Sequence, residues 1–182
     1  MPAKIVLLNG VGSGGKSAIA KALQTITKEP FLHVAMDSFL EMLPEAYQDH
    51  PDGVAYETVY EDGKPLVVIR VGSVGERALR GMRHAIAAMA DQGNNLIVDD
   101  VLTGDAAAYS DLLSPFDLFT VGVFAPLDVL EARERERGDR LPGLARWQFD
   151  RVHAGMTYDL EVDTSTAEPM ACAEQIKQAF RL

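Results

Sequence analysis

Cysteine is nearly absent from this 182-residue sequence, which contains only Cys172. One cysteine cannot form an internal disulfide, so we expect an apolar core to stabilise the fold and a reducing, cytoplasmic compartment. No uninterrupted apolar run approaches the ~18 residues that a membrane-spanning helix needs. No charged-then-apolar leader opens the chain, so we expect neither secretion nor a membrane location.

Basic residues are also scarce. Lys and Arg total 17 against 27 Asp and Glu, which gives a formal net charge of −10 at pH 7. Because binding to a phosphate backbone requires clustered positive charge, this balance argues against a nucleic-acid partner. An anionic ligand would need a local positive site. The length suits one domain, so we expect residues 1–182 to fold together, with homo-oligomerisation left open.

Glycine, in contrast, is concentrated near the start of the chain, in the run Gly10-Val11-Gly12-Ser13-Gly14-Gly15-Lys16-Ser17. An apolar segment (4–9) precedes this run and an amphipathic segment (17–26) follows it, which is the strand–loop–helix context of the phosphate-binding pattern G-x-x-x-x-G-K-[ST]. The loop N–H groups can face phosphate oxygens, Lys16 can reach the outer phosphates, and the Ser17 hydroxyl can bind Mg²⁺. The pattern therefore predicts ATP with Mg²⁺ as the ligand.

The same residues permit another interpretation. Gly10, Gly12 and Gly15 also form G-x-G-x-x-G, and Asp37 follows ~22 residues later, as in a dinucleotide-binding turn. Lys16 and Ser17 favour the triphosphate, because a dinucleotide turn needs neither an ammonium nor a hydroxyl at the start of the helix. A glycine turn without a ligand is the third alternative.

Apolar periodicity predicts an α/β fold in three layers, with helices on both faces of a five-stranded parallel sheet. The expected strands are 4–8, 31–36, 96–101, 118–124 and 158–162, and the expected helices are 16–27, 74–91, 105–113, 127–137, 144–153 and 171–180. Ser73 and Glu76 have capping-box spacing at the start of the second helix. Residues 54–71 predict a β-hairpin around Asp62-Gly63, either a surface flap or an element that covers the substrate.

Acidic residues follow two of the expected strands. Asp37 ends the second strand, where it could be a general base in phosphoryl transfer or the N-cap of a short helix. Asp99 and Asp100 end the third strand and point to opposite faces. We favour Asp99 for the Mg²⁺ site and leave Asp100 open, since an acid beside a phosphate loop often holds the metal.

Arginines gather at the end of the fourth helix and in the turn that follows it, at Arg133, Arg135, Arg137 and Arg140. Acidic residues alternate with them, so one interpretation is a helix with ion pairs three and four residues apart. The other is a lid near residues 133–146. In that interpretation Arg133 binds the nucleotide, and Arg137 and Arg140 neutralise charge on the transferred phosphoryl group.

Several short motifs occur along nearly the full length of the chain. They are Leu8-Asn9-Gly10, Gly15-Lys16-Ser17, Glu29-Pro30, Asp37-Ser38, the segment 97–101, Arg137-Gly138-Asp139-Arg140 and the segment 158–164. In this combination the chain resembles the chloramphenicol phosphotransferase family of P-loop kinases. The resemblance implies strand order 2-3-1-4-5. It also implies transfer of the ATP γ-phosphate to a hydroxyl of a chloramphenicol-like molecule, which inactivates an antibiotic, with Asp37 as the base. Two alternatives are a kinase of a nucleoside or sugar and a non-catalytic nucleotide-binding switch.

Overall fold

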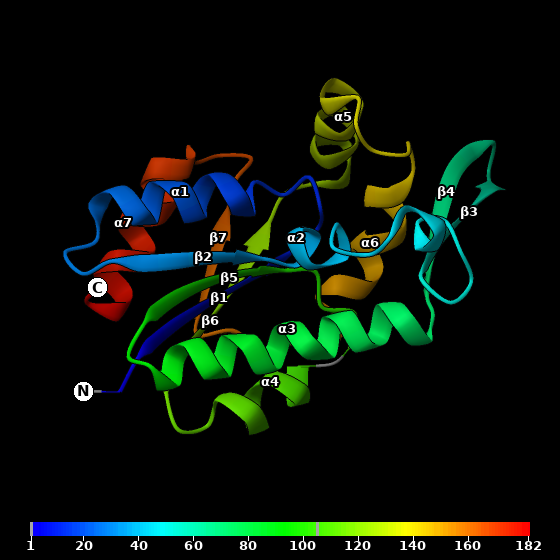
Figure 1. Ribbon diagram of the computed structural model, residues 1–182. Helices are drawn as coiled ribbons and strands as arrows, with labels where there is room; N and C mark the ends of the chain where they lie inside the picture. Colours follow the sequence, from blue (N-terminus) through cyan, green and yellow to red (C-terminus); the bar gives the residue numbers. More distant parts are fainter. Residues whose placement is uncertain (1, 105) are drawn as a thin grey trace.

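A five-stranded parallel sheet forms the centre of the computed structural model, which describes residues 2–104 and 106–182 (Figure 1). Its strands are β1 (Lys4–Gly10), β2 (Phe31–Ala35), β5 (Asn95–Asp100), β6 (Asp117–Phe124) and β7 (Leu160–Asp163). They lie in the order β2-β5-β1-β6-β7. When the separate hairpin is left out of the count, this is the predicted order 2-3-1-4-5.

Helices cover both faces of the sheet, which confirms the predicted three layers (Figure 1). One face packs against α1 (Lys16–Ile26) and α7 (Pro169–Phe180), and the other against α3 (Ser73–Asp91) and α4 (Ala106–Leu113). Strand β1 shows how one strand contributes side chains to both faces. Val6 and Leu8 belong to the core with α1 and α7, whereas Ile5 and Leu7 belong to the core with α3 and α4. Successive side chains of a strand point to opposite faces, so a strand buried on both faces is apolar throughout.

The remaining elements lie beyond the carboxyl ends of the strands (Figure 1). They are α2 (Met36–Leu40), the 3₁₀ turn η1 (Glu45–Tyr47), α5 (Leu127–Arg137), α6 (Leu144–Val152) and the antiparallel pair β3 (Val54–Glu61) and β4 (Lys64–Val71). The hairpin turns at Asp62 and Gly63, whose φ angles of 49° and 75° are left-handed. Within the described residues, no helix combines the length and apolarity needed to cross a membrane.

The capping box predicted at Ser73 is wrong. Helix α3 already includes Ser73, its N-cap is Gly72, and no side chain caps it. The Asp52 carbonyl accepts hydrogen bonds from the N–H groups of Val74 (2.8 Å) and Gly75 (3.3 Å) instead. A neighbouring loop therefore satisfies these donors. The predicted helix 105–113 begins at Ala106 in the structure, and Asp105 lies outside the described residues.

Candidate active site

The loop between β1 and α1 folds around the ammonium group of Lys16. Lys16 is buried, and its Nζ donates to the carbonyl oxygens of Gly10 (2.9 Å) and Val11 (3.0 Å). Gly10 must be glycine here, because a Cβ would lie 2.5 Å from the Val123 carbonyl oxygen, and Gly15 has a φ of 89°. Burial lowers the pKa of Lys16, and the nearby Asp99 carboxylate opposes this shift. The loop thus holds one buried positive group beside its backbone.

Asp99 reaches the same loop from the end of β5. Its Oδ2 accepts a hydrogen bond from the Ser17 hydroxyl at 2.5 Å, and its Oδ1 lies 3.6 Å from Lys16 Nζ. His33 Nε2 lies 3.6 Å from Asp99 Oδ2. Burial acts to raise the pKa of Asp99, but His33, Lys16 and Ser17 together hold it below its ordinary value. Asp99 therefore presents an ionised carboxylate at the head of α1.

Asp100 points away from the loop, as the alternation of strand side chains requires. Its Oδ2 accepts from the Tyr109 hydroxyl (2.7 Å) and its Oδ1 from the Val101 N–H (2.7 Å). Burial raises the pKa of Asp100. Of the two neighbouring acids, Asp99 faces the phosphate loop, whereas Asp100 joins β5 to α4.

The oxygen donors at this point suit a metal that arrives with a nucleotide. Among the described residues, no group of three or more His, Cys, Asp and Glu side chains could hold a metal ion. The Ser17 hydroxyl and the Asp99 carboxylate nevertheless supply hard oxygen atoms side by side. Mg²⁺ usually takes only one or two protein oxygens and completes its shell with water and phosphate. Ser17 and Asp99 therefore suit Mg²⁺ that is also held by phosphate and water, and they are too few to hold a metal ion by themselves.

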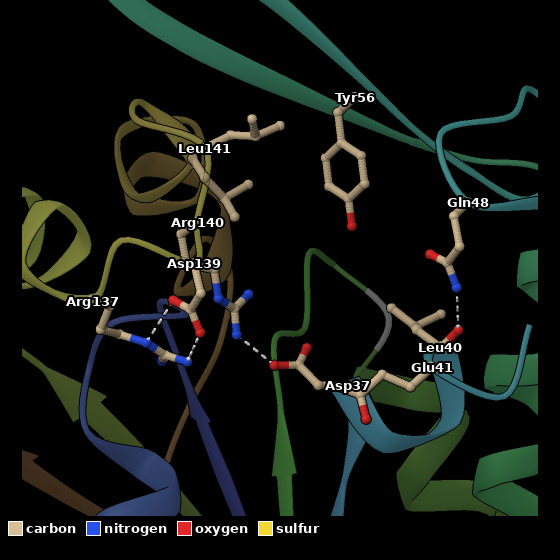
Figure 2. A pocket seen from close by; sticks show the side chains of 10 residues that line it. Asp37, Leu40, Glu41, Gln48, Tyr56, Arg137, Asp139, Arg140 and Leu141 are labelled. Carbon is tan, nitrogen blue, oxygen red and sulfur yellow. Dashed lines mark hydrogen bonds and ion pairs between the residues drawn. The ribbon is translucent and has the colours of Figure 1, made fainter. Parts of the chain in front are cut away.

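Asp37 lies in the first turn of α2, directly after β2. Its Oδ2 accepts from Arg140 Nη2 at 2.5 Å, so the candidate base forms an ion pair with an arginine of the segment between α5 and α6 (Figure 2). The alternative that Asp37 is the N-cap is wrong, because Ala35 occupies that position and no side chain caps the helix. The carboxylate is thus directed toward Arg140, not toward the N–H groups of its own helix.

The other two predicted arginines also lie beside the phosphate loop. Arg137 donates to both carboxylate oxygens of Asp139, at 3.1 and 3.0 Å (Figure 2). Arg133 donates to the Thr164 hydroxyl (2.9 Å) and the Thr164 carbonyl (2.7 Å). Both line an open cavity next to residues 12–18. Neither pairs, within the described residues, with an acid three or four positions away, so the helix-surface alternative does not describe them.

Two residues of the site were missed by the sequence analysis. Gln148 accepts a hydrogen bond from the Gly12 N–H at 2.8 Å, and the Thr164 hydroxyl donates to the Gly14 carbonyl at 3.0 Å. Both polar side chains are buried. The available signals were a polar residue between two aromatic residues on one helix and a threonine just after a strand. Neither signal indicated a contact with the phosphate loop.

Two cavities meet at the ion pair between Asp37 and Arg140. A small cavity of about 60 Å³ is lined by Gly12, Lys16, Ser17, Ala35, Met36, Asp37, Asp99, Val101, Arg137, Arg140 and Gln148. A larger cavity of about 310 Å³ shares Met36, Asp37, Val101, Arg140 and Gln148 and adds Leu40, Val54, Tyr56, Ile69, Val71, Leu79, Thr103, Leu144 and Trp147. The first is polar and borders the phosphate loop. The second is mostly apolar.

The hairpin forms part of the apolar wall. Val54 and Tyr56 come from β3, and Ile69 and Val71 from β4. Figure 2 shows Tyr56 facing the same hollow as Asp37 and Arg140, which continues outward as a cavity of about 360 Å³. Burial raises the pKa of Tyr56, and the charge of Asp37 adds to the shift. The hairpin thus supplies one wall of the hollow beside Asp37.

A phosphate loop with its buried lysine, an acid at the neighbouring strand end and arginines over the loop define a protein of the P-loop kinase class. The chain belongs to the family described as chloramphenicol phosphotransferase-like protein, which it matches over residues 3–181. This confirms the predicted family and the predicted enzyme class, a phosphotransferase with a hydroxyl acceptor.

This chain is similar to one named relative in sequence and to solved kinase structures in fold. "Putative O-phosphotransferase Rv2636" of Mycobacterium tuberculosis is 31% identical over 186 residues, which cover 98% of this chain and 82% of the relative. The solved APS kinase CysC of Mycobacterium tuberculosis, in complex with AMPPNP and APS, has a TM-score of 0.67 at 16% identity, covering 100% of this chain and 99% of that one. A sugar kinase from Janibacter sp. HTCC2649 has a TM-score of 0.67 at 18% identity, covering 99% and 95%. These two structures confirm the fold.

Proposed function

We propose that this protein is an ATP- and Mg²⁺-dependent O-phosphotransferase whose acceptor is a hydroxyl on a small molecule with an apolar, chloramphenicol-like body. One observation carries the proposal: Asp37 lines both the polar cavity at the phosphate loop and the apolar cavity under the hairpin. A carboxylate at this junction can meet an acceptor hydroxyl and the phosphate that it attacks. The family and the named O-phosphotransferase relative support the same reaction type.

On the phosphate side, the loop N–H groups and Lys16 would bind the triphosphate. Lys16 Nζ now bonds to the carbonyls of Gly10 and Val11, and phosphate oxygens would replace these neutral acceptors with charged ones. Ser17 and Asp99 would hold Mg²⁺, which supplies charge neutralisation to the phosphates when bound. Arg133, between Thr164 and the open cavity, is placed to bind the nucleotide.

On the acceptor side, Asp37 would take the proton of the hydroxyl. The hydroxyl oxygen forms a bond to the γ-phosphorus as the bond from that phosphorus to the β–γ bridging oxygen breaks, and ADP leaves. Arg140 first has to move its guanidinium from Asp37 to the phosphoryl oxygens. Arg137 can join it, because its partner Asp139 lies at the exposed rim of the outer cavity. The apolar wall favours acceptors with an aromatic or branched body over a sugar or nucleoside.

The test is a screen for ATP consumption with Mg²⁺ across candidate hydroxyl compounds, including chloramphenicol, a sugar and a nucleoside, followed by mass spectrometry of the product. We expect phosphorylation of an apolar alcohol and its loss in Lys16→Ala. Turnover of only the sugar or nucleoside would show that the acceptor belongs to that class and not to the apolar alcohols. Binding of Mg·ATP with no phosphorylated product from any compound would support a nucleotide-binding switch.

The lone cysteine, Cys172, is buried and free, which is consistent with the reducing, cytoplasmic compartment in which we expect this reaction.

A further inference from the structure

Gln148 is a buried polar side chain at the phosphate loop, and among the described residues only the oxygen of its amide has a hydrogen-bond partner. It is 3% exposed, and its Oε1 accepts from the Gly12 N–H at 2.8 Å. Within residues 2–104 and 106–182, its Nε2 donates to no protein acceptor. This nitrogen is not among the fully buried side-chain atoms that lack a partner, so it reaches the surface of the cavities that Gln148 lines, where a ligand or water can accept its hydrogen bond.

The helix that carries Gln148 is anchored at both ends. At its start, the buried Glu134 carboxylate accepts from the N–H groups of Gly143 (2.8 Å) and Ala145 (2.7 Å). At its end, Asn9, the residue before the phosphate loop, donates from Nδ2 to the Val152 carbonyl at 2.9 Å. Helix α6 is therefore tied to α5 and to β1, and Gln148 is held toward Gly12 before any ligand binds.

The unused donor lies where the phosphoryl group would be transferred. A Cβ on Gly12 would lie 3.2 Å from Gln148 Oε1, 3.9 Å from Gln148 Nε2 and 3.7 Å from Arg140 Nη1. The amide and the guanidinium therefore converge over one residue of the loop. Gln148 also lines both cavities, as Asp37 and Arg140 do. A neutral N–H donor at this junction suits a phosphoryl oxygen, since it orients the group without adding charge.

We propose that Gln148 is a further ligand of the transferred phosphoryl group: its Oε1 stays on the Gly12 N–H, and its Nε2 donates to a non-bridging phosphoryl oxygen. This inference rests on the proposed function. The competing role is structural, in which Gln148 only satisfies the Gly12 N–H. The two roles differ in whether the donor contributes once the γ-phosphoryl position is filled.

The experiment compares binding of ADP alone with binding of ADP, Mg²⁺ and aluminium fluoride, which mimics the phosphoryl group in transfer. Calorimetry is carried out on the wild type, on Gln148→Met and on Gln148→Asn, whose shorter amide cannot reach from Gly12 to the phosphoryl oxygen. Gln24→Met is the matched control, because Gln24 lies on α1 and, among the described residues, its side chain bonds only to the Phe31 carbonyl. We expect both Gln148 variants to weaken the fluoride complex ~10- to 100-fold more than they weaken the ADP complex, and Gln24→Met to weaken neither.

Equal fluoride-complex affinity in the wild type and the Gln148 variants would overturn the inference and leave the proposed function standing. A wild type that binds neither ADP nor the fluoride complex would overturn both. Loss of ADP affinity in parallel with the fluoride complex would indicate the structural role. Thermal unfolding of both variants shows whether each is folded, and Gln148→Asn keeps a polar group in the site if Gln148→Met proves unstable.

Discussion

Replacing Asp37 by Asn separates the two roles that the structure leaves for this carboxylate, proton acceptor and partner of Arg140. Asn keeps the shape of the side chain and an oxygen that can accept from Arg140 Nη2, but it cannot take a proton at neutral pH. If Asp37 is the base, phosphoryl transfer should fall ~10²- to 10⁴-fold, the usual contribution of a general base. This corresponds to ~2.7 to 5.5 kcal/mol of activation free energy.

The effect on stability should be much smaller. The side chains of Asp37 and Arg140 are 47% and 22% exposed, so their ion pair is partly screened by solvent in spite of its 2.5 Å length. Pairs of this kind contribute ~1 kcal/mol or less, and Asn preserves part of the contact. For a chain of this size the melting temperature should fall by no more than ~2 to 4 °C. The proton-acceptor role therefore predicts a large kinetic change with a small thermal one.

The assay measures turnover of the acceptor identified by the screen, calorimetric binding of Mg·ATP and thermal unfolding. Asp128→Asn is the matched control, since Asp128 is an exposed acid in the first turn of α5, outside both cavities. We expect near-normal ATP binding in both variants and a loss of turnover in Asp37→Asn alone. Full phosphotransfer by Asp37→Asn would refute the reasoning and reduce Asp37 to an ion-pair partner.

Three further predictions concern the lid and the buried acids. Arg140→Ala should lower kcat ~10³-fold or more with a smaller change in ATP affinity, because a guanidinium stabilises transition-state charge; Arg137→Ala should act in the same direction, and wild-type kinetics in the double variant would contradict both. Glu134→Gln should lower the free energy of unfolding by ~1 to 3 kcal/mol, because the amide NH₂ would face one of the two backbone N–H groups that donate to the buried carboxylate. An unchanged midpoint of denaturant unfolding would show that Glu134 does not anchor the start of α6. Burial raises the pKa of Asp100 in the folded state, so its contribution to stability is full below the unfolded value and is lost as pH rises through the raised pKa. Asp100→Asn should therefore flatten the dependence of melting temperature on pH above about pH 4, the ordinary carboxyl pKa, and an unchanged slope would argue against the shift.

The elements and the family could be predicted because they depend on local or repeated patterns. The apolar run in β1 predicts a strand buried on both faces, and Ile5 and Val6 do belong to different cores. The start of α3 could not be predicted in the same way. The donors of its first turn are satisfied by the Asp52 carbonyl, which lies in a loop beyond any local pattern.

The choice between Asp99 and Asp100 likewise depends on more than the local sequence. Strand alternation predicts that the two carboxylates point apart, but not which of them meets the loop. The pairing of β5 with β1 turns Asp99 toward Ser17 and leaves Asp100 with Tyr109.

The sequence by itself determined the phosphate loop, the alternation of strands and helices and the acids and arginines available for chemistry, since each follows from neighbouring residues. Only the tertiary structure decided which of them meet. Asp37 and Arg140 are 103 positions apart, and Gly12 and Gln148 are 136 apart. No local pattern carries such a pairing, because it depends on how each crossover returns the chain to the same edge of the sheet and where the packed helices come to rest.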